Sequence, residues 1–200
     1  MDSILADLVL YAQKGGYVMP PLMLATVVLW FCIGVRWTNL QRGNARSVRV
    51  MLDRAREGRL KPPKGVLDQA VFLGIEESNK PHDELRPYLD DRFAGFEKQI
   101  RQFKSLITAI VAVAPLMGLL GTVIGMIETF ESLGDMSLFS QSGGIAGGIS
   151  QALFTTQMGL AVAIPGLMMK GYLDRKEDEI ELELAQLKDM LCASQTGGNP

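Results

Sequence analysis

The sequence predicts an all-α membrane protein with three transmembrane helices, of which the second and third are long and extend into the cytoplasm. Three stretches are almost free of charge, and one of them, Leu106 to Ile127, has no charged residue over 22 positions. At 1.5 Å per residue, a helix of this length spans the roughly 30 Å hydrocarbon core of a bilayer. Charged residues gather in the segments between these stretches, which is typical of a chain that alternates between membrane and water.

The N-terminal part is predicted to combine a surface helix with the first span. Residues 1–16 place apolar side chains at helical spacing, which indicates an amphipathic helix at the periplasmic membrane surface. Residues 17–36 form the predicted first span, which is followed at the interface by Trp37. Only Lys14 provides positive charge before this span, so we expect a retained helix and not a cleaved signal peptide.

The segment 37–104 is predicted to be a cytoplasmic helical region. From Arg36 to Lys104 there are 15 Lys and Arg residues against 10 Asp and Glu, and such an excess marks the cytoplasmic side. Helical patterns cover 44–59 and 66–77. A later amphipathic stretch is expected to run without a break into the second span, 105–130, because its apolar residues share one face: Leu89, Phe93, Phe96, Ile100 and Phe103.

The C-terminal half is predicted to cross the membrane once more and to end in the cytoplasm. Residues 131–144 form a periplasmic loop, since this region lacks Lys and Arg. The third span, 145–170, contains several polar residues, which are costly in lipid unless they face partner helices or water. Residues 171–200 form a cytoplasmic helix and tail with apolar residues at steps close to 3.5, a pattern that favours helix packing: Leu173, Ile180, Leu184, Leu187 and Leu191.

Composition argues against several classes of function. The net charge of −2, with no basic stripe interleaved with aromatics, argues against nucleic acid as a partner. Two cysteines and one histidine provide no metal-binding spacing, and no catalytic triad or phosphate-binding loop is visible. We therefore expect a protein that is not an enzyme and that has no cofactor or metal.

The second span carries a stripe of hydroxyls beside a groove of glycines. Thr108, Pro115, Thr122 and Thr129 recur every seven residues, and the groove consists of Gly118, Gly121 and Gly125. Glycines at this spacing let helices approach closely. A buried threonine often returns its hydroxyl to a carbonyl of its own helix, and we expect this of Thr108. For Thr122, which two of the glycines flank, we favour a role at a polar surface.

The third span presents polar groups in more than one direction. Gln151, Thr155 and Gly159 share one face, whereas Thr156 points about 140° away from Gln151. Either this helix meets polar surroundings on two sides, or some of these groups only form hydrogen bonds to neighbouring helices. Pro115 and Pro165 lie inside the second and third spans, where we expect a packing role.

Three sequence motifs resemble those of the MotA/TolQ/ExbB proton-channel family. They are APLMGLLGTVIGM from residue 114, GGISQALFTT from residue 147 and GLAVAIP from residue 159. The resemblance covers roughly residues 88–172. Three spans with a cytoplasmic segment between the first two are more similar to ExbB or TolQ than to the four-span MotA.

The resemblance implies an assembly and an energy source. Members of this family form a pentameric ring whose second and third helices surround a pore. The pore holds the single transmembrane helices of an ExbD/TolR-type partner, and the assembly uses the proton motive force. In ExbB relatives this energy is transferred to a TonB-type protein, which drives outer-membrane transport. For this chain the resemblance implies the bacterial inner membrane. The distribution of Lys and Arg predicts a multi-pass protein with a periplasmic N-terminus and a cytoplasmic C-terminus.

The resemblance also assigns residues to the pore. The family's pore threonines match Thr122 and Thr156, and its pore acid falls on Gln151, whose amide cannot exchange a proton as a carboxylate does. The remaining motif residues are expected to pack helices together: Gly118, Gly121, Gly125, Pro115, Gly159 and Pro165.

Three alternatives stay open at this point. The first is a TolQ-like subunit that maintains the cell envelope. The second is a pentameric scaffold that does not conduct, which Gln151 favours and the two pore threonines oppose. The third is a small-solute transporter, although the sequence shows no inverted repeat and three spans are few for that class.

Overall fold

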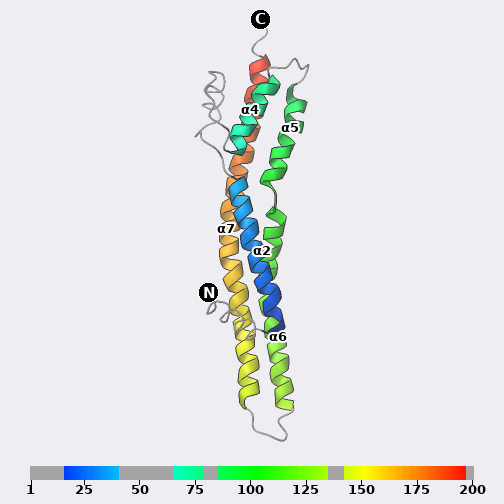
Figure 1. Cartoon of the computed structure of the whole chain (residues 1–200), viewed down its shortest axis with the longest axis vertical. Coiled ribbons are helices and arrows are strands. Elements are labelled where there is room, and N and C mark those ends of the chain that lie inside the picture. Colours follow the sequence, from blue (N-terminus) through cyan, green and yellow to red (C-terminus); the bar gives the residue numbers. More distant parts are fainter. Residues whose placement is uncertain (1–15, 41–64, 79–84, 135–141, 197–200) are drawn as a thin grey trace, which may run out of the picture. The chain divides into compact units, whose positions relative to one another are not determined.

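The structure, a computed structural model, describes residues 16–40, 65–78, 85–134 and 142–196. Its elements are the short 3-10 helix η1 (Gly16–Val18) and the helices α2 (Met19–Asn39), α4 (Val66–Ser78), α5 (Leu85–Ile100), α6 (Lys104–Gly134) and α7 (Ser142–Thr196) (Figure 1). All elements in the described part of the chain are helices, as predicted. The predicted helices at 1–16 and 44–59 and most of the loop 131–144 lie outside the described residues.

Three stretches are long and apolar enough to cross a membrane, which agrees with the three predicted spans. They are Gly16–Asn39, Arg86–Glu131 and Ile145–Ala193, the second of which includes α5, the turn after it and α6. Pro20 and Pro21 lie in the first turn of α2, where the missing N–H groups would have no helical partner in any case. Pro115 and Pro165 lie inside α6 and α7.

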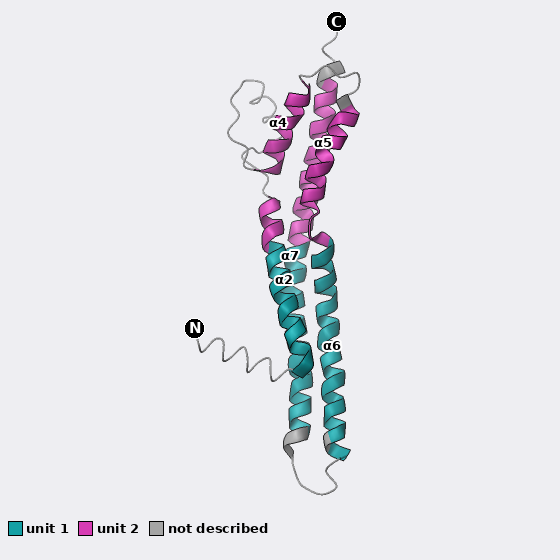
Figure 2. Cartoon of the chain, turned by 45° about the vertical axis from the view of Figure 1, so that its right-hand side comes forward, with its two compact units in different colours: residues 1–33, 105–170 teal, residues 34–104, 171–200 magenta. Residues whose placement is uncertain are grey.

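The chain divides into two compact units, coloured separately in Figure 2. The first unit comprises residues 1–33 and 105–170, so it contains most of α2, nearly all of α6 and the first half of α7. Its buried side chains come from all three helices and include Leu22, Leu29, Ile107, Val111, Ala152 and Val162. Its outer faces carry large apolar residues that are well exposed, as expected of helices that meet lipid or other subunits: Leu24, Phe31, Leu116, Leu153 and Met168.

The second unit comprises residues 34–104 and 171–200. The predicted helix at 66–77 is confirmed by α4. The apolar stripe predicted for the C-terminal helix is also confirmed, because Leu173, Ile180, Leu184, Leu187 and Leu191 are all buried. Leu89, Phe93 and Ile100 of α5 are buried as well, which confirms the apolar face predicted for that helix.

The expectation of an unbroken helix into the second span is wrong. α5 ends at Ile100 and α6 begins at Lys104, and Phe103 between them adopts a left-handed backbone with φ of 63°. In this turn the Gln102 N–H donates to the Gln99 carbonyl and the Lys104 N–H to the Arg101 carbonyl, each three residues back. The apolar spacing continues across the break, so side-chain periodicity could not indicate it.

Ion pairs to α7 hold both sides of this turn. Arg101 lies 2.7 Å from Glu181, and Lys104 lies 2.8 Å from Glu177. A left-handed residue other than glycine costs about 1–2 kcal/mol, and contacts on both sides of the turn offset such a cost. Sequence patterns carry no signal for this break, because the turn contains neither glycine nor proline.

Candidate functional site

The two helices that carry the motifs, α6 and α7, pack through small residues in an antiparallel pair. A β-carbon added to Gly118 would lie 3.1 Å from the Thr155 carbonyl oxygen, and one added to Gly125 would lie 3.0 Å from the Ala152 Cβ. A β-carbon added to Gly159 would lie 3.1 Å from the Gly118 Cα. The predicted glycine groove therefore serves the contact between two helices of the same chain, which we call the α6–α7 seam.

Thr155 occupies the closest part of the seam. Its side chain is fully buried and lies directly above Gly121, so that a β-carbon there would be 2.5 Å from the Thr155 Cβ. Its hydroxyl donates to carbonyls of its own helix, those of Gln151 at 3.1 Å and Ala152 at 3.0 Å. A helix can hold a buried hydroxyl in this way without a partner from elsewhere.

Thr122 and Thr156 lie together on one flank of the seam. Each follows a seam residue, Gly121 or Thr155, by one position, which is a rotation of about 100° around its helix. In an antiparallel pair of right-handed helices these two rotations lead to the same side. Both threonines are half-buried. We call this side of the pair the threonine flank.

Both hydroxyls of the threonine flank donate to nearby carbonyls. Thr122 donates to the Leu119 carbonyl in its own helix at 2.6 Å. Thr156 lies 3.2 Å from the Ala152 carbonyl in its own helix and 3.4 Å from the Gly118 carbonyl across the seam. Each hydroxyl oxygen keeps lone pairs that can accept a hydrogen bond from water or from another polar group.

An apolar hollow continues the threonine flank along the seam. It has a volume of about 480 Å³ and is lined from both helices by Thr108, Val111, Ala112, Pro115, Leu160, Ala163, Ile164, Leu167 and Lys170. Pro115 and Thr108 belong to the same seven-residue repeat as Thr122, and Leu160 stands one turn beyond Thr156. The flank therefore combines two hydroxyls with an apolar surface that extends toward Lys170.

Gln151 points away from the threonine flank. Its side-chain amide lies against Gly16 of η1, at a point where an added β-carbon would collide with the Nε2 atom. Gly16 has a φ of 58°, a conformation that favours glycine. The face predicted for Gln151, Thr155 and Gly159 is therefore divided, since Thr155 and Gly159 contact α6 and Gln151 contacts the chain before α2.

Two seam residues were not among the predicted site residues. Gly148 faces Thr129, whose hydroxyl donates to the Gly125 carbonyl at 2.7 Å, and Thr155 faces Gly121. Thr155 lies four residues before Gly159 on α7, and this spacing matches that of the glycines on α6. The sequence therefore held a signal that could have identified Thr155. Pro165 is half-buried inside α7, and Gly166 beside it packs on Leu29 and Val111.

The spans contain no charged group at the depth of the seam. The chain has none from Ser105 to Ile127 and none from Ser142 to Met169. Any proton that crosses here would therefore need water or a titratable group from another chain, because hydroxyls and amides do not ionise at neutral pH.

Comparisons with known proteins agree with these features. The model of the MotA/TolQ/ExbB proton channel family matches residues 62–186. The biopolymer transport protein ExbB-like 1 of Synechocystis is 34% identical over 169 residues, which cover 78% of this chain and 66% of that protein. ExbB-like 3 of the same organism is 30% identical over 167 residues, which cover 78% of this chain and 80% of the relative. The biopolymer transport protein ExbB of Aquifex aeolicus is 36% identical over 86 residues, 43% of this chain and 57% of that protein. The chain thus spans slightly less than two thirds of the first of these relatives.

Proposed function

Because this chain belongs to the MotA/TolQ/ExbB proton channel family, we propose that it is the ring-forming subunit of a proton-driven motor in the bacterial inner membrane. In this proposal five copies surround a pore that holds the transmembrane helices of an ExbD-type partner. The motor uses the proton motive force to energise a TonB-type protein for outer-membrane transport. The N-terminus is periplasmic and the C-terminus cytoplasmic.

The threonine flank is the observation that carries this proposal. It places Thr122 and Thr156 on one side of the α6–α7 seam, and the apolar hollow follows them on the same side. An apolar partner helix could rest in that hollow while the two hydroxyls face a polar group that it carries. Gln151 supports the same orientation, since its side chain contacts Gly16 before α2 and points away from the two threonines. The flank away from α2 is thus available to a pore.

The chemistry available on this flank limits what the subunit does with a proton. Thr122 and Thr156 can orient water and accept or donate hydrogen bonds, but neither carries charge. The titratable group would be a carboxylate of the partner helix. Each proton that crosses a potential of 100 mV provides about 2.3 kcal/mol, so several protons could rotate a partner inside the ring.

Proton flux into liposomes tests the proposal directly. The chain would be reconstituted with its ExbD-type partner, and the wild type compared with Thr122→Val and Thr156→Val. We expect both variants to lower the flux several-fold, because each loses a hydroxyl on the threonine flank. Thr26→Val is the matched control, since the Thr26 hydroxyl donates to the Leu22 carbonyl within α2 at 2.8 Å.

A scaffold that holds a partner without conducting protons is the second candidate, and the amide at Gln151 favours it. Flux that stays equal in the wild type and both flank variants would support the scaffold and contradict the motor. A TolQ-like subunit for envelope maintenance would instead conduct protons when it is reconstituted with a TolR-type partner. The mass of the purified complex in detergent checks the five copies independently of flux.

A further inference from the structure

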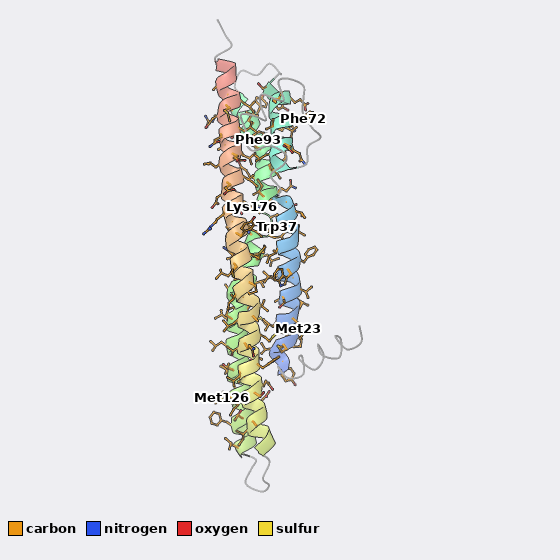
Figure 3. The ribbon with its side chains drawn as sticks, turned by 90° about the vertical axis from the view of Figure 1, so that its left-hand side faces the viewer. Met23, Trp37, Phe72, Phe93, Met126 and Lys176 are labelled. Carbon is orange, nitrogen blue, oxygen red and sulfur yellow. The ribbon has the colours of Figure 1, made fainter. Side chains whose placement is uncertain are left out.

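Two stacked aromatic rings hold a lysine next to the end of the first span. Trp37 of α2 and Tyr172 of α7 stack with ring centroids 5.5 Å apart and an angle of 21° between their planes. The Lys176 Nζ lies 4.9 Å from the centroid of each ring, and Figure 3 shows this lysine beside Trp37. The rings are 44% and 45% exposed. These three residues form an accessible group, which we call the aromatic–lysine cluster.

Two of the carboxylates near Lys176 on α7, Asp174 and Glu177, are engaged by other cations, whereas Asp178 and Glu179 are exposed. Arg36 lies 2.8 Å from Asp174 and also pairs with Glu177, and Lys104 lies 2.8 Å from Glu177. Within the described part of the chain, the interactions of Lys176 are its two cation–π contacts alone. Lys176 therefore makes no ion pair with a carboxylate of the described residues.

The cluster stands at the level where a bilayer presents its headgroups. Trp37 follows the uncharged run 17–35 by two residues, and Tyr172 follows the uncharged run 145–169 by three. Aromatic side chains with a polar edge are enriched at this level, and lysines just outside a span attract anionic lipid headgroups. The rings also offer an apolar surface to the glycerol and the first acyl carbons of a lipid.

We propose that the aromatic–lysine cluster binds the phosphate of an anionic phospholipid in the adjacent leaflet. The ammonium of Lys176 pairs with the phosphate, and the stacked rings of Trp37 and Tyr172 hold that ammonium in place and contact the glycerol backbone. This inference depends on the membrane spans and on the cluster, and it holds whether or not the chain conducts protons.

Quenching of Trp37 fluorescence by brominated lipids tests the inference. The chain has two tryptophans, so Trp30→Phe leaves Trp37 as the only reporter. The full chain would be reconstituted in mixtures of phosphatidylcholine and phosphatidylglycerol, with one or the other lipid brominated. We expect brominated phosphatidylglycerol to associate about fivefold more strongly than brominated phosphatidylcholine at equal mole fraction. Lys176→Gln should remove this preference.

Arg175→Gln is the matched control, because Arg175 is exposed, adjacent in sequence and equal in charge. It should keep the preference, which separates a site from general surface charge. Three results would each overturn the inference. The first is an equal loss of the lipid preference in Lys176→Gln and Arg175→Gln, and the second is equal quenching by both lipids in the wild type. The third is no quenching at all, because a second copy of the chain covers Trp37. Reversal of the preference by soluble glycerol phosphate would also overturn it, since the site would then take a free phosphate. Equal quenching of all variants in pure brominated phosphatidylcholine verifies that they are inserted.

Discussion

Thr155 of α7 lies directly over Gly121 of α6, and this contact sets the separation of the two helices. An alanine β-carbon at position 121 would lie 2.5 Å from the Thr155 Cβ and 2.8 Å from its Cγ2, which is closer than side-chain atoms can approach. Because Thr155 is fully buried, it has no free space into which it could rotate. The helices would have to move apart.

Gly121→Ala should therefore destabilise the chain by about 1–3 kcal/mol, the usual cost of overpacking. Unfolding of the purified protein in increasing concentrations of a denaturing detergent would measure this change. Gly147→Ala is the control, because nothing lies within 4 Å of a β-carbon added there. If both variants unfolded at the same detergent concentration, the close contact between Gly121 and Thr155 would be refuted.

Arg36→Met should destabilise the second unit because it leaves two carboxylates without their main cation. Arg36 is fully buried and pairs with Asp174 and Glu177, of which Glu177 is 1% exposed. Removing one partner of a buried pair costs about 3–5 kcal/mol, and Lys104, which remains 2.8 Å from Glu177, should keep the cost near the lower value. Thermal unfolding followed by circular dichroism gives the measurement.

The control for this change is an exposed ion pair in the same unit. Arg86 and Asp189 are 67% and 65% exposed and lie 3.3 Å apart, so Arg86→Met should cost less than about 1 kcal/mol. Adding Glu177→Gln to Arg36→Met should recover part of the lost stability. An Arg36→Met variant as stable as Arg86→Met would mean that Arg36 is hydrated and not buried.

The turn at Phe103 can be tested by comparing glycine with alanine at that position. Both substitutions remove the aromatic ring, but only glycine tolerates the left-handed backbone at little cost. Phe103→Gly should therefore be more stable than Phe103→Ala by about 1 kcal/mol. In a continuous helix the order would reverse, because alanine is about 1 kcal/mol better than glycine inside a helix.

Gln99, which is exposed within α5, provides the helical reference for this comparison. Gln99→Ala should be more stable than Gln99→Gly, the opposite order to that at Phe103. Thermal midpoints of the four variants give the answer, and the same order at both positions would restore the unbroken helix.

Acid should weaken the second unit through two exposed ion pairs. The hydrogen bond from Arg101 lowers the pKa of Glu181 below its ordinary value of 4.5, and that from Lys188 lowers the pKa of Asp90 below 3.8. A carboxylate with a lowered pKa adds stability above its ordinary pKa, and this stability disappears as the pH falls through the folded value. The thermal midpoint should therefore fall between about pH 5 and about pH 3. Glu181→Gln should reduce the change, and an unaltered pH dependence in that variant would exclude the pair.

The sequence was sufficient to predict the helices. Burial of apolar side chains gives a periodic spacing of apolar residues, and exclusion of charge from lipid gives long runs without charged residues. The three spans, α4 and the buried stripe at Leu173, Ile180, Leu184, Leu187 and Leu191 all follow from these traces. The motifs also indicated the family, because they resemble family members over whole runs of residues and not only in the spacing of single residues.

Only the tertiary structure decided how each helix is rotated about its axis. Helical geometry points Thr155 and Thr156 in different directions, but only the contact with Gly121 shows that the first is buried in the seam and the second lies on the threonine flank. Likewise, Gln151 contacts Gly16, and the turn at Phe103 breaks a stripe whose spacing is perfect. The rotation of each helix depends on which surfaces of two distant segments fit closely together. Van der Waals contact between such segments produces no periodic pattern in the sequence of either segment.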